Sequence, residues 1–259
     1  MMTNQWSPEN CNMKLEFSGK NALILGGSCE IGILLGQLMI LSGLFPLMTF
    51  RSPEGEKRIA SALQPVSDQY ASGFLDFAQP ASIDDFFSRN TGELHYLVDL
   101  IHGDLEQLVA SRFSRNIGRF YEENVSMRAK VLEIVSRRML GQKFGRLVYV
   151  SSTAAARPHP GQGFYASSKL ASEAIYKNLG LELGGKNITT VVLRPGYIDV
   201  GRGRSYAASR RKEILEKIPI KRLLSAGEVA ETIMFLISDS ARGLNATEIV
   251  LDGGLCAGK

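Results

Sequence analysis

The sequence predicts an α/β fold in which a doubly wound, seven-stranded parallel sheet carries helices on both faces. Short apolar runs rich in β-forming residues recur along the chain, and segments with apolar residues at three-to-four spacing lie between them. Strands that alternate with helices pair in parallel through crossover connections, so this order favours a single continuous sheet.

The predicted elements follow one another without a break. Strands are expected at residues 21–25, 44–50, 71–77, 96–101, 146–151, 189–193 and 248–251. Helices are expected at residues 30–42, 54–63, 83–89, 124–140, 165–183 and 226–238. No linker, repeat or low-complexity tract separates them, so we expect one domain at residues 15–259, after a polar extension at residues 1–14.

Residues 201–222 fit neither pattern. They are rich in arginine and follow the sixth predicted strand, which places them at the carboxyl ends of the strands, where ligands bind in such folds. This segment is therefore the expected lid, and we predict it to be irregular.

The bulk composition excludes several classes of protein. With 44% apolar and 22% charged residues, the 259-residue chain is neither disordered nor fibrous. A formal charge of +4 is too small for a dedicated nucleic-acid-binding protein. The cysteines Cys11, Cys29 and Cys256 lack metal-ligand spacing, so we expect no metal site and a reducing, cytoplasmic location.

One apolar stretch raises the question of a membrane span. Residues 31–50 carry no charge and are long enough to cross a bilayer, but Pro46 and several glycines interrupt them. A buried helix, a turn and a buried parallel strand explain the same run. We therefore expect no membrane association, and the polar N-terminus does not resemble a secretory signal.

A glycine-rich loop joins the first strand to the first helix, with the sequence LGGSCEIG at residues 25–32. Glycine permits a tight turn, and a helix N-terminus offers unpaired N–H groups and a favourable dipole to a phosphate. A turn of this kind needs glycine even without a ligand. In the context of the parallel sheet, the loop favours a Rossmann-type dinucleotide site. The candidate contacts are Gly26, Ser28, Ile31 and Gly32.

Arg51 bears on the choice of cofactor. It ends the second strand, where the adenosine ribose would lie, and a base at a position that usually carries an acid for NAD suits the 2′-phosphate of NADP. A solvated arginine at a strand end is the alternative interpretation. We expect NADP(H) rather than NAD(H).

Three further residues form a candidate proton-transfer group. Tyr165 and Lys169 lie four residues apart on a predicted helix, and so on one face, one turn apart. A phenol is a poor acid–base group at neutral pH, and a nearby ammonium stabilises its phenolate. Ser152, at the end of an apolar strand, could hydrogen-bond a substrate carbonyl that is becoming an alkoxide.

These motifs resemble those of short-chain dehydrogenases/reductases from about Lys14 to the C-terminus. The resemblance gives Ser152, Tyr165 and Lys169 catalytic roles. It adds Asn124 as the residue that helps to hold a proton-relay water near the lysine. It also implies an NAD(P)-dependent oxidoreductase acting on CH–OH or C=O groups, and a homodimer or homotetramer.

The resemblance also implies more of the cofactor site. RPGYI at residues 194–198 resembles the segment that packs against the nicotinamide, and residues 76–77 match the pair that meets the adenine ring. The contacts implied are Asp76, Phe77, Tyr165, Lys169, Pro195, Gly196 and Ile198.

Four positions depart from the family pattern. Leu25 replaces a threonine, Glu30 replaces the middle glycine of the loop, and Val200 replaces a threonine that commonly bonds the nicotinamide amide. Asp99 begins a segment, DLIH, where the family has Asn-Asn-Ala-Gly. We expect these changes to alter cofactor affinity or pose.

Within the family, residues 142–146 and 212–223 resemble those of 3-oxoacyl-[acyl-carrier-protein] reductases. The expected activity is NADPH-dependent reduction of a ketone, in particular a 3-oxoacyl thioester, to a secondary alcohol, with Tyr165 as proton donor. One alternative is a dehydrogenase of a sugar, polyol, steroid or other secondary alcohol. Another is a non-catalytic NADP(H)-binding scaffold.

An acidic acyl carrier protein is a possible partner on the same grounds. Lys143 and Lys186 fall near positions that carry basic residues for the carrier in these reductases. The lid arginines could reach a phosphopantetheine phosphate. A solvated basic surface explains the same charges. The lid arginines are Arg202, Arg204, Arg210 and Arg211.

Overall fold

The computed structural model describes residues 15–112, 116–208 and 210–257, and its seven strands form one parallel sheet in the order β3-β2-β1-β4-β5-β6-β7. The strands are β1 (Asn21–Leu25), β2 (Phe45–Phe50), β3 (Ala71–Phe74), β4 (Tyr96–Asp99), β5 (Gly145–Val150), β6 (Ile188–Pro195) and β7 (Thr247–Leu251). All six neighbouring pairs are parallel, which confirms the predicted fold class. The chain first places β2 and β3 on one side of β1 and then crosses to the other side, where β4 to β7 follow. Ligands bind at the carboxyl ends of the strands beside such a switch point, here between β1 and β4.

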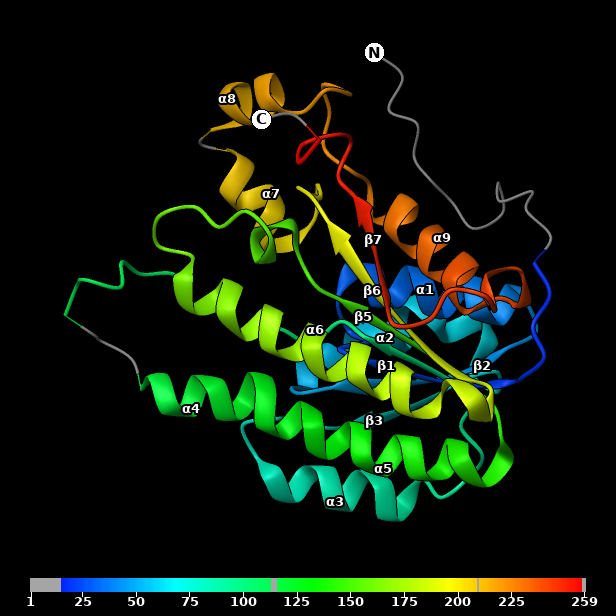
Figure 1. The fold of residues 1–259 in the computed structure, drawn as a ribbon. Coiled ribbons are helices and arrows are strands. Elements are labelled where there is room, and N and C mark those ends of the chain that lie inside the picture. Colours follow the sequence, from blue (N-terminus) through cyan, green and yellow to red (C-terminus); the bar gives the residue numbers. More distant parts are fainter. Residues whose placement is uncertain (1–14, 113–115, 209, 258–259) are drawn as a thin grey trace.

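Helices cover both faces of the sheet (Figure 1). One face carries α1 (Glu30–Leu41), α2 (Pro53–Leu63) and α9 (Ala226–Ile237), and the other carries α3 (Pro80–Arg89), α5 (Met127–Gln142) and α6 (Gly163–Leu183). Strand side chains alternate between the two: Ala22 and Ile24 join the first core, while Leu23 and Leu25 join the second. Apolar residues are therefore required at the four successive positions 22–25 of β1.

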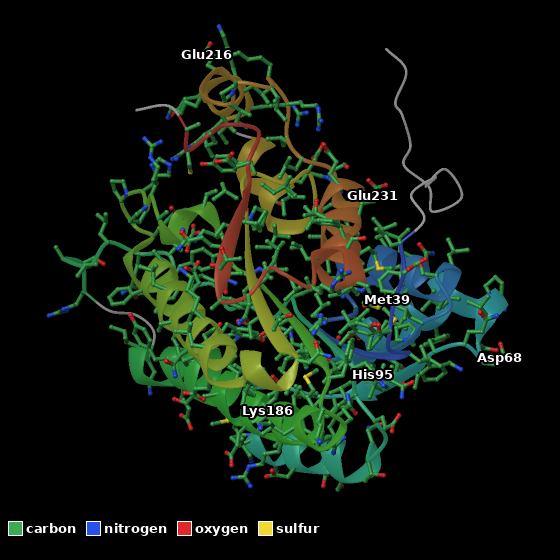
Figure 2. The ribbon with its side chains drawn as sticks, turned by 45° about the vertical axis from the view of Figure 1, so that its right-hand side comes forward. Met39, Asp68, His95, Lys186, Glu216 and Glu231 are labelled. Carbon is green, nitrogen blue, oxygen red and sulfur yellow. The ribbon has the colours of Figure 1, made fainter. Side chains whose placement is uncertain are left out.

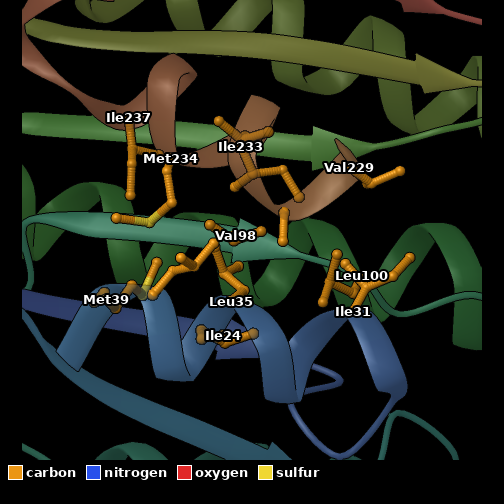
Figure 3. Close-up of a cluster of buried hydrophobic side chains, with 14 of the residues drawn as sticks. Ile24, Ile31, Leu35, Met39, Val98, Leu100, Val229, Ile233, Met234 and Ile237 are labelled. Atoms are coloured by element: carbon orange, nitrogen blue, oxygen red, sulfur yellow. The ribbon is translucent and has the colours of Figure 1, made fainter. Parts of the chain in front are cut away.

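The core between α1 and α9 fixes the start of α1 at the edge of the sheet. Figure 3 shows Ile31, Leu35 and Met39 of α1 facing Val229 and Ile233 of α9. All five are buried, and a fully buried aliphatic side chain of this size contributes about 1.5–3 kcal/mol. The N-terminus of α1 is thus held firmly beside the end of β1.

The expected lid is helical rather than irregular. Residues 201–222 contain α7 (Gly201–Ala208) and α8 (Arg211–Lys217), so the prediction of an irregular segment was wrong. Ile214 and Ile218 are buried against Leu223 in a small cluster of their own, and Lys217 pairs with Glu213 one turn away at 2.6 Å. Helices this short show too few apolar repeats to be recognised from periodicity.

Two predicted strands run too far, and one predicted helix begins too early. The third strand ends at Phe74 and the fourth at Asp99, and each is followed by a turn in which an aspartate Oδ1 accepts a backbone N–H two residues on, 3.0 Å away. The helix predicted at residues 124–140 begins at Met127, after α4 (Ile117–Tyr121) and a π-helical turn (Glu122–Ser126).

The apolar run at residues 31–50 divides into α1, a turn and β2, as expected of buried elements. Within the described ranges, no helix has both the length and the apolarity to cross a membrane. The predicted N-terminal extension at residues 1–14 lies outside the described residues.

Candidate active site

A cavity of about 1290 Å³ opens at the carboxyl ends of the strands. Its walls come from the N-terminus of α1, the ends of β4, β5 and β6, the start of α6, and the α7–α8 segment. Figure 2 shows Glu216 of α8 at one end of the molecule and His95 and Lys186, which come just before β4 and β6, toward the other. The cavity is larger than the roughly 300–1,000 Å³ typical of small-ligand pockets, so it has room for a dinucleotide and a substrate.

The structure brings Ser152, Tyr165 and Lys169 together on one wall of this cavity. Ser152 follows β5, and its Oγ accepts a hydrogen bond from the Ala154 N–H at 3.1 Å, so it caps a short 3-10 helix. Tyr165 lies in the first turn of α6 and Lys169 in the second. The predicted proton-transfer group is thus assembled from a strand end and an adjacent helix face.

Lys169 is held in a defined and largely buried position. Its side chain donates from Nζ to the Val150 carbonyl at 2.9 Å, and the residue is only 4% exposed. Nζ also lies 5.9 Å from the ring centroid of Tyr165 and 4.9 Å from that of Tyr149. An ammonium placed in this way favours the phenolate form of a neighbouring tyrosine. Burial raises the pKa of Tyr149 to about 12, so Tyr149 remains protonated at neutral pH.

Asn124 does not line the cavity. Its Oδ1 accepts from the Gly103 N–H at 2.6 Å, and its Nδ2 donates to the Phe120 carbonyl at 2.8 Å. Its backbone carbonyl accepts from Arg128 Nη1 and from Ser172 Oγ. The Asn124 side chain therefore ties the segment after β4 to the π-helical turn. The Asn124 backbone carbonyl is already bound by the side chains of Arg128 and Ser172.

Sequence reasoning missed the buried ion pair of Arg128 and Asp99. Arg128 is 1% exposed, donates from Nε to Asp99 Oδ2 at 2.6 Å and from Nη2 to the Ile101 carbonyl at 2.6 Å. The Tyr176 hydroxyl donates a hydrogen bond to the same Asp99 oxygen at 3.1 Å. Burial lowers the pKa of Arg128, but the Asp99 carboxylate more than offsets this, and the net shift is upward. This pair accounts for the acid at position 99.

A second polar network supports the strand ends beside the cavity. Glu173, 2% exposed, accepts from Ser151 Oγ at 2.5 Å and from Arg194 Nε at 2.9 Å. Arg194 also donates from Nη1 to Glu248 at 2.9 Å. Ser151 directly precedes Ser152, and Arg194 directly precedes Pro195. Because Glu173 of α6 binds both, the network fixes these two parts of the cavity wall to α6.

Four predicted cofactor residues besides Tyr165 and Lys169 line the cavity, namely Ile31, Pro195, Gly196 and Ile198. A Cβ on Gly196 would lie 2.9 Å from the Cβ of Asp252, so this position requires glycine. Val200, one of the four departures, lines the same wall. The α1 N-terminus and Tyr165 line the same cavity, whose volume of about 1290 Å³ has room for a dinucleotide.

The other predicted cofactor residues lie outside the cavity wall, namely Gly26, Ser28, Gly32, Arg51, Asp76 and Phe77. Gly26 has φ +75° and donates its N–H to Thr49 Oγ1 at 2.9 Å, and a Cβ on Gly32 would lie 2.6 Å from the Gly27 carbonyl oxygen. These glycines therefore shape the turn. Phe77 is buried in the core, so its side chain is not available to a ligand.

Arg58 is a basic residue that the sequence did not single out. It is exposed on α2 and lines the cavity beside Cys29 and Glu30, whereas Arg51 is exposed at the end of β2. Cys29 caps α1 by accepting from the Gly32 N–H at 3.3 Å, and burial raises the pKa of its thiol. The position of Arg58 on a helix surface gave no signal that it would face the cavity.

Lys143 and Lys186 do not flank the cavity mouth. Lys143 ends α5 just before β5, and Lys186 lies just before β6, so both lie at the amino ends of the strands. The cavity opens at the carboxyl ends. Besides Lys169, the lysines and arginines that line the cavity are Arg58, Arg157 and Lys217.

Fold and site together define an oxidoreductase that uses NAD(P) and acts on CH–OH or C=O groups. The model of the family described as enoyl-(acyl carrier protein) reductase matches residues 34–256. The chain therefore belongs to the short-chain dehydrogenase/reductase family.

Individual relatives agree with this assignment. The chain is 28% identical over 247 residues to a 3-oxoacyl-[acyl-carrier-protein] reductase, FabG, of Salmonella typhimurium, covering 93% of this chain and 99% of that protein. It is 26% identical over 245 residues to the corresponding reductase MabA of Mycobacterium tuberculosis, covering 95% and 96%.

Solved structures share the fold. The crystal structure of YwfH, described as an NADPH-dependent reductase involved in bacilysin biosynthesis, superimposes with a TM-score of 0.85 at 21% identity, covering 93% of this chain and 100% of that one. The structure of ElxO with NADP bound gives a TM-score of 0.84 at 22% identity, covering 92% and 99%.

Proposed function

We propose that this protein reduces a 3-oxoacyl thioester to the secondary alcohol with NADPH. The observation that carries the proposal is that Ser152, Tyr165 and Lys169 line the same cavity as the N-terminus of α1. The FabG and MabA relatives, both described as 3-oxoacyl-[acyl-carrier-protein] reductases, support the substrate class.

The bound cofactor supplies the hydride. Ser152 donates a hydrogen bond to the ketone oxygen and stabilises the negative charge that develops there. Tyr165 transfers its hydroxyl proton to that oxygen, and Lys169 stabilises the phenolate that remains. Asn124 has an indirect role in this scheme: its side chain holds the segment after β4 by accepting the Gly103 N–H.

An assay of NADPH oxidation with an acetoacetyl thioester tests the proposal, and we expect steady turnover with a preference for NADPH over NADH. Absence of turnover with the thioester, together with oxidation of a sugar, polyol or steroid alcohol, would favour the alternative dehydrogenase. NADPH binding without turnover of any carbonyl or alcohol in the panel would favour a non-catalytic scaffold.

Arg51 and Arg58 are the proposed determinants of NADPH preference. A 2′-phosphate carries up to two negative charges, and each charge-assisted hydrogen bond to it contributes about 1.5–3 kcal/mol. We expect Arg51→Ala and Arg58→Ala each to raise the Kd for NADPH about tenfold and to leave the Kd for NADH within about threefold.

Titration of cofactor fluorescence measures both constants. Lys57→Ala is the matched control, since Lys57 neighbours Arg58 on α2 and does not line the cavity. Equal effects of either arginine substitution on NADPH and NADH would remove that residue from the 2′-phosphate site.

A further inference from the structure

Glu30 places a negative charge where a dinucleotide needs a positive one. It is the first residue of α1 and lines the cavity. The N-terminus of a helix attracts anions, which is why phosphates bind there. A carboxylate at this position gains the same stabilisation, so it competes with the pyrophosphate and repels it.

Arg204 of α7 forms an ion pair with Glu30. Its Nη2 lies 3.5 Å from Glu30 Oε2, although Glu30 is on α1 and Arg204 is on α7. The neighbouring residues Gly203 and Ser205 of α7 line the cavity, as Glu30 does. The ion pair therefore joins the lid to the glycine loop.

Asp199 holds the Arg204 guanidinium in this orientation. Arg204 Nε lies 3.2 Å from Asp199 Oδ1, and Nη2 donates to the Asp199 backbone carbonyl at 2.6 Å. Both contacts come from the segment that leads into α7, so they fix the guanidinium to the lid itself. Among the described residues, the contact to Glu30 is the one that joins Arg204 to a different element of the fold.

The location of this pair distinguishes it from an ordinary surface ion pair. The side chains of Arg204 and Glu30 are 57% and 49% exposed, and a pair this exposed adds little to folding stability. Its effect on an anionic ligand differs, because the loss of Arg204 leaves the Glu30 carboxylate facing the incoming phosphates without a counter-charge.

We propose that Arg204 makes the glutamate-bearing loop compatible with the cofactor: it neutralises Glu30 at the pyrophosphate-binding end and so holds α7 over the bound dinucleotide. The loop departs from the family pattern at Glu30, and the cation on the lid compensates for that departure. Arg204 is thus a positioning residue for cofactor binding.

The test is the Kd for NADPH, measured by fluorescence titration at low ionic strength without substrate. We expect Arg204→Met to raise the Kd at least about tenfold. Glu30→Gln should bind at least as tightly as the wild type. The double variant Glu30→Gln/Arg204→Met should return to within about threefold of the wild type, because it has neither charge.

Lys212→Met is the control for loss of one lid charge, since Lys212 is an exposed residue of α8. The proposal fails if Arg204→Met binds NADPH as tightly as Lys212→Met, or if the double variant is as weak as Arg204→Met. Recovery of binding in the double variant also excludes misfolding as the cause. The readout is cofactor binding, so a failure of the thioester assay leaves this result intact.

Discussion

Replacement of Tyr165 by phenylalanine is expected to lower kcat by about 10²–10⁴-fold, the usual contribution of a positioned general acid. Tyr165 lines the cavity on the first turn of α6, with Lys169 Nζ 5.9 Å from its ring centroid. The substitution deletes only the hydroxyl, so the proton that neutralises the alkoxide has to come from water. The ring remains, and cofactor binding should remain with it.

Single-turnover and steady-state rates of NADPH oxidation, together with the Kd for NADPH, measure this effect. We expect the Kd to stay within about threefold of the wild type, because a change confined to the chemical step lowers kcat and leaves ground-state binding intact. Tyr70→Phe is the control, since Tyr70 precedes β3 and lies outside the cavity wall. Full activity in Tyr165→Phe would assign the proton transfer to another group.

The sequence predicted most of the fold because the central strands β1, β4, β5 and β6 are buried on both faces. The bounds of β1 were predicted correctly, since the apolar run from Ala22 to Leu25 follows Asn21 and ends at Gly26. Strand ends were less predictable where aspartates turn the chain, as Asp76 and Asp99 do. The helices α7 and α8 were missed because 8 and 7 residues give too few turns to show a period.

The candidate site likewise contains residues that the sequence predicted and residues that it did not. Tyr165 and Lys169 are four residues apart on one helix, so sequence spacing alone brought them together. Arg128 and Asp99 are 29 residues apart and meet only when α5 packs on β4. The signal was present in part: an acid in an apolar strand requires a buried cation, but the sequence did not say which of many cations would supply it.

Arg128 carries the largest expected effect on stability. Breaking a buried ion pair by removing one partner typically costs about 3–5 kcal/mol, because the other charge stays buried without compensation. Arg128→Met leaves the Asp99 carboxyl group, which is 0% exposed, without its cation, and it removes the Arg128 donors to the carbonyls of Ile101 and Asn124. We expect the free energy of unfolding to fall by about 3–5 kcal/mol.

Denaturant unfolding of Arg128→Met, Asp99→Asn and the double variant tests this estimate. Replacing both partners removes the buried charge, so the double variant should recover most of the stability that either single variant loses. Arg137→Met is the control, since the Arg137–Glu133 pair on the same helix is 75% and 60% exposed and should change unfolding little. A double variant no more stable than Arg128→Met would mean that the contacts of Arg128 to the backbone carbonyls, rather than its charge pairing, stabilise this layer.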